Sequence, residues 1–150
     1  MMDNLSMFAI MMIASLLSTM NIWTDNWRDI RLSLNDFYMA FLMTGWMFLF
    51  MGLFNYISNT VHRPHNSAIM QILLGLSLIL ISMFFIRNQT FIDQQQYLRG
   101  MIPHHSMALH MSRKLLENYD AKLDPRVRAL ATNILKTQTE EIDLMKSISS

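Results

Sequence analysis

The stretch AIMQILLGLSLILISMFFI, residues 68–86, contains no charged side chain. A helix needs about 20 apolar residues to cross the hydrocarbon core of a bilayer, so this length predicts a membrane span. Residues 5–23 and 37–57 are apolar stretches of similar length, also without charge. Trp23 and Tyr56 lie near the ends of these stretches, where aromatic side chains favour the bilayer interface. The sequence therefore predicts three transmembrane helices.

The first apolar stretch has an alternative interpretation as a secretory signal. Residues 1–4 contain no basic side chain, and no A-x-A-like cleavage site follows the apolar run. We therefore expect a retained helix. The links at residues 24–36 and 58–67 are short, so neighbouring spans are expected to be antiparallel.

Charged residues gather in the second half of the chain. Nine of the 12 Lys and Arg residues and seven of the 11 acidic residues follow residue 86. This asymmetry predicts a three-helix transmembrane region at residues 1–87 and a soluble C-terminal domain at residues 88–150. The net charge is only +1 and no basic run occurs, so a lipid bilayer is the expected partner and nucleic acid is not. Because cysteine is absent, disulfides, thiolate metal sites and cysteine nucleophiles are excluded.

The C-terminal domain has the pattern of an all-α helical hairpin. Residues 89–119 predict one long helix, interrupted or bent at Pro103, which lacks an amide donor. Asp124 and Pro125 predict the start of a second helix, with Asp as the N-cap and Pro in the first helical position. A hairpin of about 60 residues buries little surface, so we expect either a homodimer that closes a four-helix bundle or docking onto its own membrane helices.

The first helix of this hairpin carries Met101-Ile-Pro-His104-His105-Ser-Met107-Ala-Leu-His110-Met111. At about 100° per residue, the three methionines of this stretch and His105 all lie within about 100° of His104 around the helix. His110 lies on the far side. Imidazole suits copper, zinc and iron, and thioether sulfur favours Cu(I). The stretch therefore predicts a copper site beside the membrane. In the alternative interpretation the methionines fill the core, since 16 of the 150 residues are Met, and the histidines cap or pack.

Two residues of the second helix could take part in the same site. Glu141 and Met145 are four residues apart, and an antiparallel hairpin brings their helix alongside the first. Glu141 would either complete the coordination or orient a histidine. Its alternative role is part of a solvated face. Two other sets of soft or borderline ligands have weaker support. Met39, Met43, Met47 and Met51 recur every four residues in the second span, as a stripe that could relay Cu(I) through the bilayer but that is more often packed or lipid-facing. His62 and His65 in the following link could bind metal on the opposite side.

The runs MIPHHSMALHMS, at residues 101–112, and DPRVRALATNILKTQTEEIDLMKS, at residues 124–147, resemble domain-of-unknown-function family 305. The resemblance covers roughly residues 93–148, and members with three preceding membrane spans exist. It implies a ferritin-like hairpin or bundle, usually exported, with some members tied to copper binding and copper tolerance. Many members have an acidic residue ten positions before the first His; here that position is Gln94, with Asp93 adjacent.

The resemblance also implies that the C-terminal domain lies in the periplasm, with the spans in a bacterial inner membrane. The positive-inside rule favours the opposite orientation by a few residues. Four arginines lie near the membrane on the C-terminal side, Arg28, Arg31, Arg87 and Arg99, and only Arg63 lies on the other side. We give the resemblance more weight, because the charge count depends on so few side chains.

Nothing in the sequence predicts catalysis: there is no nucleophile elbow, phosphate loop, HExxH zinc motif or Glu-x-x-His pair. We therefore expect a membrane-anchored protein, not an enzyme, that sequesters copper or exchanges it with a donor or acceptor protein. Cu(I) is the preferred ion, with Cu(II) also accepted. The alternatives are a non-metal membrane scaffold that dimerises through its hairpin and a redox enzyme or accessory factor that uses the bound metal. The predicted ligands are His104, His105, Met101, Met107, Met111, Glu141 and Met145.

Overall fold

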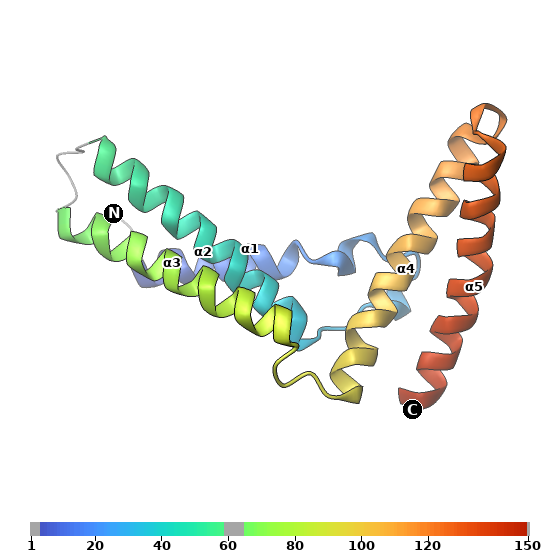
Figure 1. Ribbon diagram of the computed structural model, residues 1–150, viewed down its shortest axis with the longest axis horizontal. Helices are drawn as coiled ribbons and strands as arrows, with labels where there is room; N and C mark the ends of the chain where they lie inside the picture. Colours follow the sequence, from blue (N-terminus) through green and yellow to red (C-terminus); the bar gives the residue numbers. More distant parts are fainter. Residues whose placement is uncertain (1–3, 59–64, 150) are drawn as a thin grey trace. The chain divides into compact units, whose positions relative to one another are not determined.

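The computed structural model describes residues 4–58 and 65–149 (Figure 1). These residues form five α-helices and three short 3-10 turns, with no strand among them, which confirms the predicted all-α class. The chain divides into two compact units. The N-terminal unit comprises Met1–Thr19 and Leu34–Phe91, and the C-terminal unit comprises Met20–Ser33 and Ile92–Ser150. His62 lies outside the described residues.

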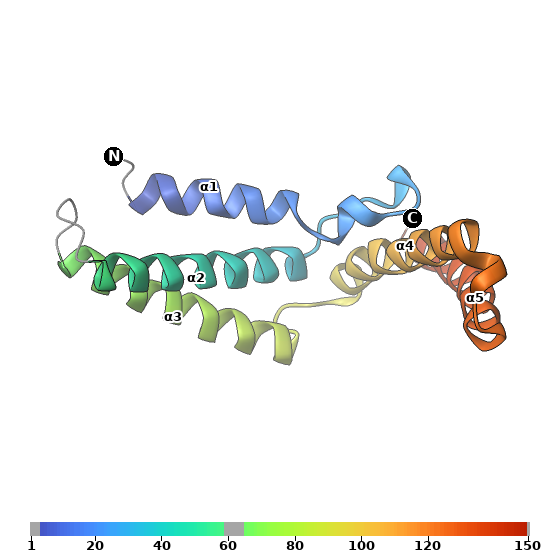
Figure 2. The same cartoon turned by 90° about the horizontal axis from the view of Figure 1, so that it is seen from above.

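The N-terminal unit contains α1 (Asn4–Leu17), α2 (Leu34–Ile57) and α3 (His65–Asn88), which lie side by side in Figures 1 and 2. Three helical stretches are long and apolar enough to cross a membrane: Asn4–Trp23, Leu34–Ile57 and Asn66–Asn88. They coincide closely with the three stretches expected from the sequence.

The first of these stretches is not one continuous α-helix. Helix α1 ends at Leu17, and a separate 3-10 turn covers Met20–Trp23. The Ser18 hydroxyl donates to the Ala14 carbonyl at 2.8 Å, a local bond of the kind that lets serine compete with the helical ladder. At about 1.5 Å per residue, the 14 residues of α1 rise only about 21 Å.

Glycines bring α2 and α3 into close contact. A Cβ added to Gly75 would lie 2.6 Å from the Leu49 backbone nitrogen and 2.8 Å from the Gly45 carbonyl oxygen. A Cβ added to Gly52 would meet the Ala68 carbonyl oxygen at 3.0 Å. Small residues at such contacts let helix backbones approach each other, which is how helices associate in lipid, where no hydrophobic effect drives them together.

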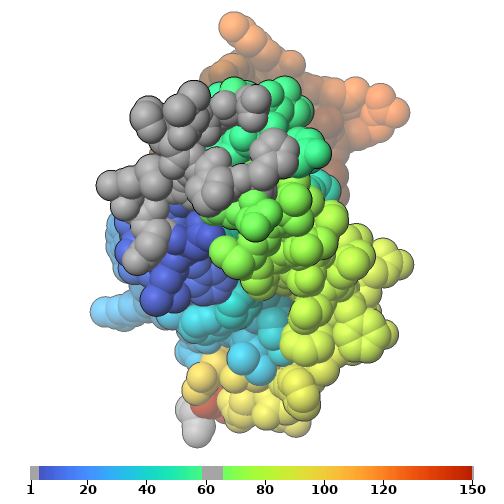
Figure 3. Space-filling view, turned by 90° about the vertical axis from the view of Figure 1, so that its left-hand side faces the viewer, coloured from blue at the N-terminus to red at the C-terminus, as the bar shows by residue number. Residues whose placement is uncertain are grey.

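Three side-chain amides connect the helices of this unit at one end. Gln71 of α3 is fully buried; it donates to Asn4 of α1 at 2.9 Å and accepts from Asn55 of α2 at 3.0 Å. Figure 3 shows dark-blue atoms of α1 directly against green atoms of α3. These bonds satisfy amides that would otherwise be costly in an apolar setting.

The methionine stripe of α2 does not line an interior path. Met39, Met43 and Met47 are each at least 40% exposed, whereas Met51 packs against a core cluster of Met7, Met11 and Phe48. Met in such positions is an ordinary apolar surface residue, so the stripe offers no support for a copper relay.

The C-terminal unit is built on a hairpin of α4 (Gln94–Tyr119) and α5 (Pro125–Ser149), joined by a 3-10 turn at Asp120–Lys122. Helix α4 continues through Pro103, so the predicted interruption is absent. The Asp93 side chain caps α4 by accepting from the Gln96 amide at 2.7 Å. The predicted start of α5 is confirmed: Asp124 accepts from the Arg126 amide at 2.8 Å and Pro125 is the first helical residue.

The hairpin core lies along one seam between α4 and α5. Buried apolar residues of both helices form a single cluster, against which Met101 and Leu135 pack. The cluster consists of Leu98, Ile102, Leu109, Ile142 and Met145. Because this seam is the apolar stripe of two amphipathic helices, it accounts for the helical spacing in the sequence.

A segment from the first loop, Met20–Ser33, packs on this hairpin, and we call it the strap. Its Asp29 is almost fully buried; the carboxylate accepts from the Ser106 hydroxyl of α4 at 2.8 Å and pairs with Lys146 of α5 at 2.5 Å. A second bond joins the Arg31 guanidinium to the Ser149 hydroxyl at 3.3 Å. The strap therefore belongs with the C-terminal unit, unlike the expected division into residues 1–87 and 88–150.

Replacing Asp29 by Asn should loosen the strap. The amide can still accept from Ser106, but Lys146 loses its ion-pair partner beside a buried site; removing hydrogen bonds to a charge typically costs about 1.5–3 kcal/mol, and the partial exposure of Lys146 favours the lower end. We expect trypsin to cleave at Arg28 or Arg31 about tenfold faster, the equivalent of about 1.4 kcal/mol. Asp143→Asn, which changes an exposed carboxylate of the same unit, is the control and should cleave at the wild-type rate.

Candidate metal-binding site

His105 and Glu141 meet across the hairpin. The His105 Nδ1 atom lies 3.2 Å from a Glu141 carboxylate oxygen, with 14% of the His105 side chain and 54% of the Glu141 side chain exposed. The two atoms are not aligned as a hydrogen bond, and Nδ1 has no hydrogen-bond partner among the described residues. A carboxylate beside one ring nitrogen of a histidine is the common arrangement by which proteins orient the other nitrogen toward a metal.

Burial lowers the pKa of His105 below its usual value of 6.5. Desolvation is the largest cause; the Glu141 carboxylate acts in the opposite direction, and the neighbouring His104 adds a smaller lowering. The neutral imidazole is thus the favoured form near pH 7. This is the form that ligates metals.

Two of the predicted thioether ligands belong to the hairpin core. Met145 is buried in the core cluster and Met101 packs against it. Their sulfur atoms therefore come from both helices, as the antiparallel arrangement predicts. Packing in the core accounts for both side chains without a metal, so their place in the fold fits either interpretation of the methionines.

The remaining predicted ligands lie farther toward solvent. His104 is exposed, with its ring centroid 6.0 Å from that of His105, and Met111 is 60% exposed. Met107 is half-buried and, two residues from His105, points about 160° away from it around α4. The structure thus pairs His105 with Glu141 and places Met101 against the core cluster that contains Met145, but it does not gather all seven side chains. Among the described residues, no three His, Asp or Glu side chains form a metal-binding group.

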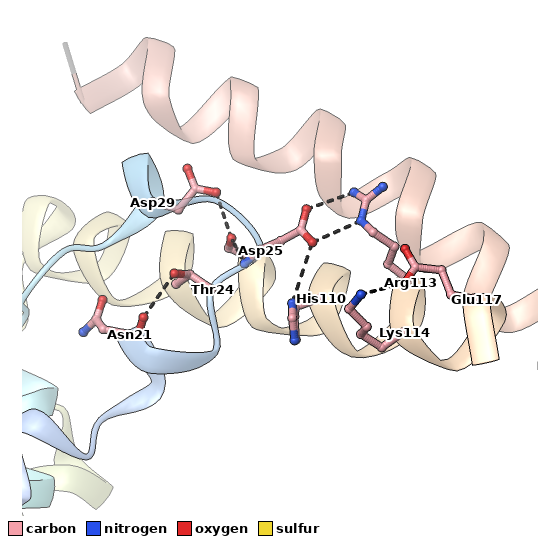
Figure 4. Close-up of polar contacts among 9 residues, drawn as sticks. Asn21, Thr24, Asp25, Asp29, His110, Arg113, Lys114 and Glu117 are labelled. Carbon is pink, nitrogen blue, oxygen red and sulfur yellow. Dashed lines mark hydrogen bonds and ion pairs between the residues drawn. The ribbon is translucent and has the colours of Figure 1, made fainter. Parts of the chain in front are cut away.

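The strap contributes two acidic residues to this unit, Asp29, described above, and Asp25. The sequence did not predict that either belongs to it. Asp25 forms a double hydrogen bond with the Arg113 guanidinium, at 2.9 and 3.1 Å, and lies 3.9 Å from His110 Nδ1 (Figure 4). Its backbone amide also donates to the Ser106 hydroxyl at 3.0 Å. These contacts give His110 a structural partner and place it away from the predicted ligands. No local signal near residues 25–29 predicts a contact with residues more than 75 positions away.

The described residues define a class of all-helical protein. It has three apolar helical stretches of membrane length and a helical hairpin bound by the strap. The family model described as domain of unknown function, DUF305, matches residues 87–149, which is the hairpin. The protein called Uncharacterized protein L153 of Acanthamoeba polyphaga mimivirus is 45% identical over 149 residues, covering 97% of this chain and 92% of that protein. The chain therefore belongs to the same family as L153, and its hairpin is similar to the DUF305 domain. No solved structure matches the chain.

Proposed function

We propose that this protein is a membrane-anchored copper-binding protein that sequesters copper or passes it to another protein. The observation that carries the proposal is the His105–Glu141 pair: a shielded imidazole, beside a carboxylate that can orient it, next to a second histidine. Thioether and imidazole donors on one hairpin suit Cu(I), and imidazoles also accept Cu(II). The ligands would be His104 and His105, with thioethers from Met101, Met107, Met111 and Met145. Glu141 would act as a ligand or as the orienting group.

The hairpin would act by reversible coordination. When bound, copper would be the cargo, and the chain's own residues would hold it and exclude competing ligands. A copper donor or acceptor protein is the predicted partner of such a site.

The proposed location of the hairpin is the outer side of the membrane, with the bacterial inner membrane and its periplasm as the predicted setting. The support is the family resemblance together with three helices of membrane length. The chain contains no cysteine, so a Lys136→Cys variant gives one thiol on an exposed position of α5. A membrane-impermeant maleimide should label it in intact cells. Labelling only after lysis would show that the hairpin lies on the inner side of the membrane.

The test of the proposed function is a metal titration of the purified full-length chain in detergent. Separate competition titrations with Cu(I), Cu(II), Zn(II) and Fe(II) would compare the affinities. We expect Cu(I) to bind most tightly, since thioethers discriminate against the harder ions. Equal or absent binding of all four ions would reject the proposal.

The second candidate is a membrane scaffold whose hairpin packs without metal. It is favoured by one observation: Met101 and Met145 already fill the core, as methionines do in ordinary packing. The scaffold predicts that helix content and oligomeric state are the same with and without copper, and that added Cu(I) is not retained.

Copper affinity should depend on pH in a way that reflects the lowered pKa of His105. Protons compete with the metal only when the imidazole is protonated, and a lowered pKa moves the competition of His105 below pH 6.5. We expect His105 to contribute no pH dependence above about pH 7, and a fall approaching tenfold per pH unit well below pH 6.5. Titrations of wild type and His105→Ala at pH 7.5, 6.5 and 5.5 isolate this contribution. If copper affinity changes with pH equally in both proteins, His105 is not a ligand.

A further inference from the structure

The exposed apolar side chains of α4 lie on one side of that helix. Relative to the buried Ile102, the strap contacts Ser106, His110 and Arg113 are turned about 20–80° in one direction. Of the large apolar residues that remain exposed, Tyr97 and Tyr119 are turned about 100–140° in the other direction, and Met111 lies opposite Ile102, at about 180°.

The exposed apolar side chains of α5 follow the same rule. Relative to the buried Ile142, Lys146, which pairs with Asp29 of the strap, is turned about 40° in the direction of the strap. The large apolar residues of α5 that remain exposed are turned about 60–160° the other way: Val127, Leu130, Leu144 and Ile148.

These two sets share one side of the hairpin. In an antiparallel pair of helices, rotation in the same sense around each helix axis, starting from the shared core, leads to the same side of the pair. Asp29 confirms this, because it contacts Ser106 of α4 and Lys146 of α5 together. The strap thus covers one side with polar contacts, and the opposite side is apolar on both helices. We call this opposite side the open face. The exposed large apolar residues of α4 and α5 fall on it, except that Met111 lies at its edge, directly opposite Ile102.

The predicted copper ligands that point toward solvent also lie on the open face. At about 100° per residue, His104 falls on the same side as Tyr97 and Met111, and Glu141 on the same side as Leu130 and Ile148. All three candidates, His104, Met111 and Glu141, are exposed. One chain alone does not bring three His, Asp or Glu side chains together among the described residues.

We propose that the open face is where a second copy of this chain docks, and that the copper site is completed across this contact by His104, Met111 and Glu141 of the two chains. The site-sharing part rests on the proposed function; the docking part does not. Positions 130, 134, 137, 141, 144 and 148 of α5 alternate in steps of four and three, the spacing of a helix-packing seam. The buried seam of α5 has the same spacing at Ala131, Leu135, Gln138, Ile142 and Met145.

A second copy fits the open face better than a membrane surface does. Helices that lie on membranes border their apolar side with Lys and Arg, which attract anionic lipids. Along α5, Lys136 and Lys146 are turned away from the open face, which presents Glu141 and, near the start of the helix, a single basic side chain, Arg126. Two hairpins joined through this face would make a closed four-helix arrangement.

The docking is tested by cross-linking the full-length chain in membranes without added metal. In the cysteine-free background, Leu144→Cys places a thiol on the open face and Lys136→Cys places one on the back of α5. We expect a bis-maleimide to convert most Leu144→Cys protein, and little Lys136→Cys protein, into covalent dimer. Equal yields at the two positions would overturn the docking.

The sharing of the site is tested with Leu130→Glu/Leu144→Glu, which keeps every predicted ligand but places four like charges in the contact of a dimer. We expect monomers whose Cu(I) affinity is at least tenfold weaker, while Lys136→Glu, an exposed change on the back of α5, keeps wild-type affinity. Monomers with unchanged affinity would overturn the shared site and leave the proposed function intact. Efficient cross-linking of Leu144→Cys, together with a wild-type chain that binds no Cu(I), would overturn the proposed function and the shared site, and support the docking.

Discussion

Replacing His104 and His105 together by Ala is expected to weaken Cu(I) binding more than about 100-fold. Loss of a single outer-shell partner commonly weakens metal binding by 10- to 100-fold, and the double change removes two proposed ligands. Helix content should be maintained, because Ala is the strongest helix former and His104 is exposed. Competition titration of the full-length chain measures the affinity, and circular dichroism measures the helix content.

His110→Ala is the matched control for this experiment. It removes the same side chain from the same helix, but His110 faces the strap, where it lies 3.9 Å from Asp25. Affinity within about threefold of wild type is expected for this variant. If the double variant keeps wild-type affinity, the histidines are packing residues and the scaffold interpretation leads.

Gly75→Leu is expected to separate α2 from α3. A Cβ at this position already approaches backbone atoms of Leu49 and Gly45 to less than 3 Å, and backbone cannot rotate away as a side chain can. Overpacking against side chains costs about 1–3 kcal/mol, so a clash with two backbone segments should cost at least that much. Unfolding by increasing SDS in mixed micelles measures the effect.

Ser77→Leu adds the same side chain two residues along α3, at a position exposed on the outside of the unit. Its free energy of unfolding should remain within about 1 kcal/mol of wild type, as for other surface changes. Equal losses in the two variants would show that α2 and α3 do not pack through Gly75.

Much of the fold is predictable from local sequence. The three apolar stretches and the Asp124–Pro125 start of α5 depend on length, charge and capping, which act within a few residues. The α2–α3 contact also has a signal in the sequence, the spacing of small residues. Gly45 and Gly52 are seven residues apart, as are Ala68 and Gly75. Small residues at that spacing mark one face of a helix.

The strap was not predictable in the same way. The Asp29 carboxylate bonds with Ser106 and Lys146, and neither partner is indicated by the sequence around Asp29. An acidic residue in a loop between two membrane spans is usually solvated, and only the fold shows that this one is buried. The break after Leu17 also differs from the expected apolar stretch to Trp23, because Met20–Trp23 belongs to the other unit.

For the candidate site, helical angles predicted where each residue lies around α4, but not which side chains surround it in the folded hairpin. They predicted that Glu141 could reach a histidine, and His105 is the one it meets. They did not reveal that Met101 and Met145 pack in the core while His104 and Met111 face outward, because burial depends on how the hairpin closes.

X-ray absorption at the copper edge of the Cu(I)-loaded, full-length chain tests the central claim most directly. Cu(I) held by this hairpin should show imidazole nitrogen and thioether sulfur in its first shell, and the nitrogen signal should disappear in the double His variant. A first shell without sulfur, or one unchanged by the loss of His104 and His105, would contradict the proposed Met and His site.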